Sequence, residues 1–246
     1  SGGGSYERVS NAVITESAGV ISVTANSQAA LTVTTAYAIG IKGSVTQWTG
    51  ITNQSWTTGT NWTNGVPDLS KKAVFVTGSP NYPASVASFT SAGMVDNNTG
   101  VILRLPDNFN AQQGLANNGT IEVIKTNNYP YTFQGFNKLS GTGTLLFTSF
   151  SNAGFTSGIA PINNNVELNR TGNFAAATVT LNGGLTLTTG NIVGNIILTN
   201  PLAAIAYSPT SYIVGTLQRS VNPSGNYLFP IGTADRLALV DMTLNN

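Results

Sequence analysis

Short stretches in which apolar and polar residues alternate recur along most of the chain, and they predict β-strands. Residues 12–41 alternate in this way with many β-branched side chains, interrupted by Gly19, the pair Asn26-Ser27 and Gly40. Residues 72–77 (KAVFVT) and 101–105 (VILRL) follow the same pattern. Helix caps followed by a helical period are missing almost everywhere. The pattern therefore predicts an all-β chain with strands of about five residues joined by short turns.

The second half of the chain repeats a turn of Asn or Gly beside a short alternating strand. The repeats start at Asn117, Ser140, Asn163, Leu181, Gly194 and Ile213. Their spacing is irregular but close to roughly 20 residues, which is typical of a parallel β-helix whose coils stack on one another. An antiparallel β-sandwich is the alternative, although its strands usually recur about every 8–12 residues. The spacing favours the parallel β-helix, a solenoid, with roughly six coils over residues 101–220.

All three tryptophans, Trp48, Trp56 and Trp62, lie close together in a segment rich in Thr, Asn and Gly. Each indole can bury about 150–250 Å² of surface, so the rings dominate whatever they pack against. We expect them to form a structural anchor that closes one edge of the β architecture. Asn61 and Asn64 are expected to satisfy main-chain groups of the polar loop. A flat aromatic platform for sugar rings is the alternative use of the tryptophans.

These patterns divide the chain into four regions. Residues 1–46 form an N-terminal strand region that we expect to contact a partner by strand addition, and residues 1–5 (SGGGS) resemble a linker. Residues 47–100 form a Trp-rich cap and turn region, and residues 101–220 form the solenoid coils. Residues 221–246 look like the start of a further β element that is interrupted. A longer parent protein is the expectation that follows.

Charged residues make up only 8% of the chain, and the formal net charge is +1. An average soluble domain has about 25% charged residues, so this surface is rich in hydrogen-bonding groups and poor in charge. No basic run exceeds Lys71-Lys72, which argues against binding to nucleic acid or to an anionic membrane. No apolar run approaches the roughly 18–20 residues of a membrane span.

Cysteine and histidine are both absent, which excludes disulfides, thiolate metal sites and histidine-activated nucleophiles. The carboxylates are scattered along the chain: Glu7, Glu16, Asp68, Asp96, Asp107, Glu122, Glu167, Asp235 and Asp241. Glycoside hydrolysis needs two carboxyl groups close together, and a solenoid could still bring Glu122 and Glu167 together from different coils. Residues 96–98 (DNN) lack the spacing of a calcium loop and predict a turn. The sequence therefore predicts no catalytic residue, no metal site and no cofactor.

A block of motifs gives the chain a family resemblance. In order along the chain, the block consists of Trp48-Thr49-Gly50, Trp56, Asn61-Trp62, Gly65-Val66-Pro67, a strand and Tyr82-Pro83. This order resembles a block in large secreted surface proteins of Bacteroidota, many of them exported by the type IX system. The later pair GTLQRSV and GNYLFPIGT, which holds Phe229 and Pro230, resembles the blocks that follow it.

The resemblance implies a β-helical or β-sandwich segment of a long adhesin-like or filamentous extracellular polypeptide. No catalytic residues carry over from those proteins, and this sequence lacks their C-terminal sorting domain. We therefore expect a non-enzymatic structural or adhesive segment of a secreted cell-surface or extracellular filament protein. Its expected partners are other copies or segments of a larger surface protein. The alternative is a carbohydrate-binding module with glycan partners, and a β-helix enzyme acting on polysaccharides is the least favoured hypothesis.

Overall fold

The computed structural model describes residues 12–17, 20–25, 44–83, 89–105, 109–123, 139–148, 154–155 and 161–245. The chain divides into two compact units, Ser1–Lys42 and Gly43–Asn246. In the first unit, β1 (Ala12–Ser17) and β2 (Val20–Ala25) pair as an antiparallel hairpin. The linker-like residues 1–5 and the strands expected between 26 and 41 lie outside the described residues. Contact of this region with a partner therefore stays a prediction.

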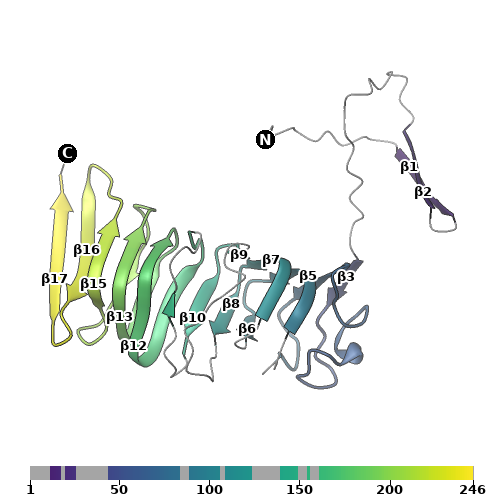
Figure 1. The fold of residues 1–246 in the computed structure, drawn as a ribbon, viewed down its shortest axis with the longest axis horizontal. Helices are drawn as coiled ribbons and strands as arrows, with labels where there is room; N and C mark the ends of the chain where they lie inside the picture. Colours follow the sequence, from purple (N-terminus) through teal and green to yellow (C-terminus); the bar gives the residue numbers. More distant parts are fainter. Residues whose placement is uncertain are drawn as a thin grey trace. The chain divides into compact units, whose positions relative to one another are not determined.

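The second unit is a β-solenoid of about five turns, with strands stacked mostly in parallel (Figure 1). One sheet has five strands in the order β3-β4-β5-β7-β9. Their bounds are β3 (Ser44–Gln47), β4 (Lys71–Phe75), β5 (Phe89–Asn97), β7 (Phe109–Asn117) and β9 (Leu139–Ser140). The parallel ladder thus begins at Ser44, and the Trp-rich segment is the loop between its first two strands. One helical turn, η1 (Gly59–Asn61), lies in that loop.

The other sheet has ten strands, with the main order β17-β16-β15-β13-β12-β10-β8-β6. The bounds are β6 (Ile102–Leu105), β8 (Thr120–Val123), β10 (Thr144–Phe147), β11 (Gly154–Phe155), β12 (Asn165–Leu181), β13 (Leu185–Leu198), β14 (Ile205–Ala206), β15 (Ile213–Arg219), β16 (Gly225–Gly232) and β17 (Leu237–Leu244). Among the described strands of this sheet, only β16 and β17 pair antiparallel. The predicted parallel β-helix is confirmed over the antiparallel sandwich. No helix in the described part of the chain is long and apolar enough to cross a membrane.

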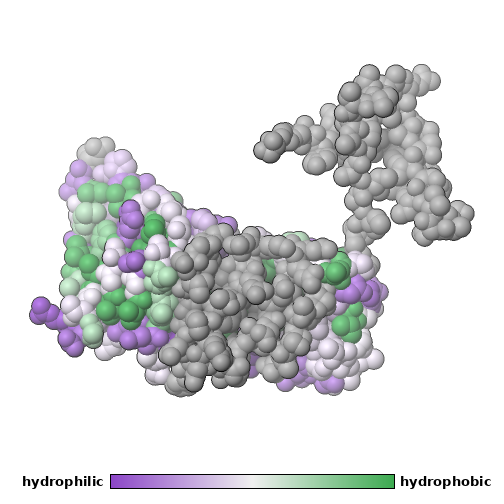
Figure 2. All heavy atoms as spheres, viewed as in Figure 1, coloured by the Kyte–Doolittle hydropathy of each residue, from purple (hydrophilic) through white to green (hydrophobic). Residues whose placement is uncertain are grey.

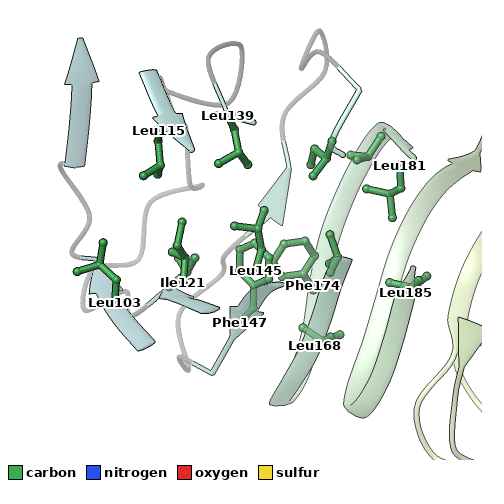
Figure 3. Close-up of a cluster of buried hydrophobic side chains, with 14 of the residues drawn as sticks. Leu103, Leu115, Ile121, Leu139, Leu145, Phe147, Leu168, Phe174, Leu181 and Leu185 are labelled. Carbon is green, nitrogen blue, oxygen red and sulfur yellow. The ribbon is translucent and has the colours of Figure 1, made fainter. Parts of the chain in front are cut away.

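Alternation along each strand builds the core, because every second side chain points into the solenoid. The strand register places Leu103, Ile121, Leu145, Val166 and Leu185 in one row across successive turns. Each is at most 2% exposed, and the close-up in Figure 3 shows four of them inside the coil. Burial of such a side chain contributes about 1.5–3 kcal/mol. The row makes each turn depend on the next for its apolar contacts.

The six sequence repeats do not correspond to six turns. The repeats that start at Leu181 and Gly194 both run into β13, so they belong to two sides of the same turn. Gly194 is in register with Gly215 of the following turn, while Leu185 is in register with Val166 of the preceding one. The expected six coils are therefore about five. The sequence pattern could not reveal this, because both sides of one turn carry the same alternation.

Asparagines line a corner where the chain passes from one sheet to the other. Asn97, Asn117 and Asn164 are all fully buried. The Asn97 amide donates to the Asn117 side-chain oxygen at 2.8 Å, and the Asn117 amide donates to the Thr144 carbonyl at 3.1 Å. The Asn164 amide donates to the Asn117 carbonyl at 3.0 Å. Buried main-chain groups need such partners, so the repeated Asn in the sequence is a consequence of the stacked corners.

Candidate functional site

The three tryptophans form a buried cluster with Phe75 at the first turn of the solenoid. Trp48, Trp56 and Trp62 are 0%, 2% and 4% exposed. Trp62 meets the other two indoles edge to face, with ring centroids 4.9 and 4.8 Å apart. All three lie within 6.0 Å of the Phe75 ring. The rings are a packing anchor, and the alternative of an exposed aromatic platform is wrong because their faces are covered.

Asn61 holds the polar loop around this cluster, as its position in the sequence predicted. Its side chain is fully buried, and its oxygen accepts from the main-chain N–H groups of Thr52 and Asn53 at 3.0 and 3.2 Å. Its amide donates to the Asn53 side-chain oxygen and to the Ser55 carbonyl at 2.8 and 2.9 Å. Asn64 acts similarly and donates to the Val45 carbonyl at 2.6 Å. The loop is therefore ordered by asparagine amides.

The first motif of the block interlocks with Asn81, the residue just before its last motif. The Trp48 indole N–H donates to the Asn81 carbonyl at 2.6 Å, and the Asn81 amide donates to the Gly50 carbonyl at 2.8 Å. Gly50 has a φ of 58°, and a Cβ there would lie 2.0 Å from the Asn81 oxygen. Only glycine fits this close approach in a left-handed conformation. The glycine of the W-x-G motif is therefore required by the turn that contains Asn81.

The two proline motifs border the same loop. Pro67 and Pro83 are both buried. Pro67 precedes the turn that leads into β4, and Pro83 follows the turn after β4. Tyr82 is partly buried against the core, and its hydroxyl donates to the Val76 carbonyl at 2.8 Å. The Y-P motif thus fixes the end of this turn to the chain just after β4.

Replacing Tyr82 with phenylalanine is expected to lower the free energy of unfolding by about 1 kcal/mol, because it removes one hydrogen bond and keeps the ring. Chemical denaturation followed by circular dichroism measures the change. Tyr207→Phe is the matched control, since Tyr207 also packs on the core but its hydroxyl makes no hydrogen bond among the described residues. An equal loss in both variants would contradict a specific role for the bond to Val76.

A cleft of about 240 Å³ opens beside the tryptophan cluster. Its walls come from the loop after Trp48, the Tyr82-Pro83 turn and the outer face of β6. The lining residues are Gln54, Tyr82, Pro83, Ile102 and Arg104. We call it the β6 cleft. Sequence reasoning identified Tyr82 and Pro83 as motif residues but missed Gln54 and Ile102, because the three segments meet only in the folded chain.

An ion pair borders this cleft. Arg104 Nε donates to Glu122 Oε2 at 2.8 Å, and Thr148 donates to Glu122 Oε1 at 2.9 Å. The two partners face each other because Arg104 and Glu122 are in register on β6 and β8. One oxygen of this carboxylate is therefore held from β6 and the other by the residue that follows β10.

Glu122 and Glu167 lie in the same row across the sheet, separated by Leu146 on β10. Two strand spacings put their backbones about 10 Å apart, and paired glycosidase carboxylates lie about 5–9.5 Å apart. Glu167 accepts a hydrogen bond from Thr188 at 3.3 Å. Stacking thus brings the two glutamates near each other, but their backbone separation lies slightly above this range. The arrangement gives no support to glycoside hydrolysis.

Within the described ranges, no three acidic, histidine or cysteine side chains gather as metal ligands would. Asp96 forms an ion pair with Lys72, and the Asn97 amide donates to the buried Asn117 side chain. The Asn98 N–H donates to the Phe75 carbonyl at 3.2 Å, and its carbonyl accepts from the Val101 N–H at 3.1 Å. Asp96 and Asn97 are still the last residues of β5, so the predicted turn begins only after them, at a corner of the solenoid.

The second block of the resemblance surrounds Arg219. Its guanidinium lies 4.9 Å from the Tyr227 ring centroid and 6.0 Å from that of Phe229. It also donates to the Leu228 carbonyl at 3.2 Å. Burial lowers the pKa of this guanidinium, and the rings and carbonyl offset the cost. Phe229 and the buried Pro230 thus belong to an anchor that joins β15 to β16.

Comparison with protein-family models, curated proteins and solved structures finds no match to this chain.

Proposed function

We propose that this chain is a non-enzymatic structural and adhesive segment of a secreted cell-surface or extracellular filament protein. A solenoid of about five turns supports this reading, because stacked turns with a shared core make a stiff spacer. The motif resemblance to adhesin-like surface proteins of Bacteroidota points in the same direction. Its partners are other copies or segments of a larger surface protein.

The surface composition suits assembly without strong repulsion. Charged residues are 8% of the chain, with a formal net charge of +1. In the described part of the chain the ion pairs are Lys71–Asp68, Lys72–Asp96 and Arg104–Glu122. A weakly charged surface leaves little electrostatic repulsion between neighbouring copies. Association therefore depends on hydrogen bonds and apolar contacts.

The observation that carries the proposal is that the outer edge of β17 pairs with no other strand among the described residues. This strand pairs with β16 over all eight residues and is the last in the ten-stranded sheet. Leu239 and Val240 are 42% and 48% exposed, and Figure 2 shows apolar residues on the surface at this end of the unit. An unprotected strand edge is a template for pairing with another strand. β17 has no lysine, proline or bulge that would prevent pairing, and Asp241 is its one charged residue.

Sedimentation velocity with negative-stain microscopy tests the proposal. We expect the purified chain to form end-to-end assemblies at increasing concentration. Val240→Lys is expected to shift the assembly midpoint to about tenfold higher concentration, because a charged side chain on an edge strand opposes pairing.

Leu202→Lys is the matched control, since Leu202 is 80% exposed and lies in a loop outside β17. It should leave the assembly midpoint unchanged. A wild-type chain that stays monomeric at all accessible concentrations would contradict self-assembly through β17. Turnover of neutral or uronic polysaccharides would contradict the non-enzymatic part of the proposal.

A further inference from the structure

The β6 cleft has no role in the proposed assembly through β17. It lies at the β6 end of the ten-stranded sheet, opposite the β17 end. Its volume of about 240 Å³ is below the roughly 300–1,000 Å³ of sites for drug-sized ligands. A cleft of this size suits one ring of a longer ligand.

One part of the cleft is apolar. Tyr82, Pro83 and Ile102 contribute it, and Ile102 is 52% exposed although it lies on a regular strand. The Tyr82 ring is fixed by the hydrogen bond from its hydroxyl to the Val76 carbonyl at 2.8 Å. The apolar surface is therefore in place before any ligand arrives, which lowers the ordering cost of binding.

The other part of the cleft offers hydrogen-bonding groups. The Gln54 side chain is exposed and makes no hydrogen bond among the described residues, and its amide carries two donors and an acceptor. Arg104 uses Nε for Glu122, and its two terminal amino groups make no hydrogen bond to any described residue. These groups provide several donors and one acceptor at the rim of an apolar surface.

The charge of the site argues for an uncharged ligand. Glu122 lies 2.8 Å from Arg104 and compensates its positive charge. The carboxylate is held on its other oxygen by Thr148 at 2.9 Å, so it stays in place as the counter-ion of Arg104. An anionic ligand would have to compete with this pair. A ligand with hydroxyl groups would not.

We propose that the β6 cleft binds one pyranose ring of a neutral glycan. The C–H face of the sugar packs on Tyr82, Pro83 and Ile102. The sugar hydroxyls accept from the Arg104 amino groups and exchange hydrogen bonds with the Gln54 amide. This inference extends the adhesive part of the proposed function and does not depend on assembly through β17. It also places glycan binding outside the tryptophan cluster.

Saturation-transfer NMR on the full chain tests the inference. The probes are methyl glycosides and short oligosaccharides of glucose, galactose, mannose and N-acetylglucosamine, with glucuronate and galacturonate oligosaccharides for comparison. We expect at least one neutral saccharide to bind. Gln54→Ala and Arg104→Gln should each weaken that binding about tenfold, because each removes hydrogen bonds to the ligand.

Gln218→Ala is the matched control, since Gln218 is also an exposed glutamine and lies on β15. It should leave the affinity unchanged. Circular dichroism confirms that each variant is folded, and sedimentation of the same samples reports on β17 separately. A folded chain that binds none of the neutral saccharides would overturn the inference. Binding confined to the uronates would overturn the neutral assignment, and binding indifferent to both cleft variants would overturn the location.

Discussion

Replacing Gly143 with alanine is expected to lower the free energy of unfolding by about 3 kcal/mol. A Cβ at this position would lie 2.1 Å from the Gly119 carbonyl oxygen and 2.9 Å from the Asn117 carbonyl oxygen. Both atoms belong to the backbone of the preceding turn, which cannot move without breaking the stacked corner. The Gly143 N–H donates to the Asn117 carbonyl at 2.8 Å, so the buried Asn117 would be displaced as well. Urea denaturation followed by circular dichroism measures the loss.

Gly59→Ala is the control for this prediction. No atom lies within 4 Å of a Cβ at Gly59, which belongs to the helical turn of the Trp-rich loop. We expect its free energy of unfolding to change by less than about 0.5 kcal/mol. If Gly143→Ala were as mild as Gly59→Ala, the close stacking of the turns at this corner would be wrong.

Replacing Trp62 with alanine is expected to destabilise the chain by about 3–5 kcal/mol. Trp62 is 4% exposed and touches both other indoles and Phe75. Its indole N–H also donates to the Trp56 carbonyl at 2.8 Å, and that carbonyl would lose its partner. Because neighbouring turns of a solenoid support one another, damage at the first turn weakens the next. Thermal and urea unfolding of the variant would measure the effect.

Ile51→Ala is the matched control in the same loop. Ile51 is 69% exposed, so its truncation should cost less than about 0.5 kcal/mol. A loss of stability for Trp62→Ala as small as that for Ile51→Ala would contradict the anchor role of the tryptophan cluster.

Much of the fold could be predicted because it is local. The alternation in 144–147 and 120–123 depends only on which side chains point inward, and the strands follow it. The turns at Asn117 and Gly143 are visible in the sequence because Asn and Gly mark turns. The number of turns was overestimated because two repeats occupy β13.

The role of the motif block was only half predictable. The sequence showed that the tryptophans are close together, and the residue types favoured packing over a platform. It could not show that Asn81 connects to Trp48 and Gly50, since those bonds join positions 31 or 33 residues apart. Likewise, the Arg219 guanidinium reaches the Phe229 ring only because the chain bends between β15 and β16.

The sequence by itself determined the all-β class, the repeated corners and the low charge, and it favoured an anchor role for the tryptophans. Each of these depends on the type and local order of residues. The tertiary structure alone decided that Glu122 pairs with Arg104, that Gln54 and Ile102 border one cleft, and that β17 is the last strand in the order of the ten-stranded sheet. These features depend on strand register and on which segments meet across turns, and a shift of one residue in register would place other side chains on the surface.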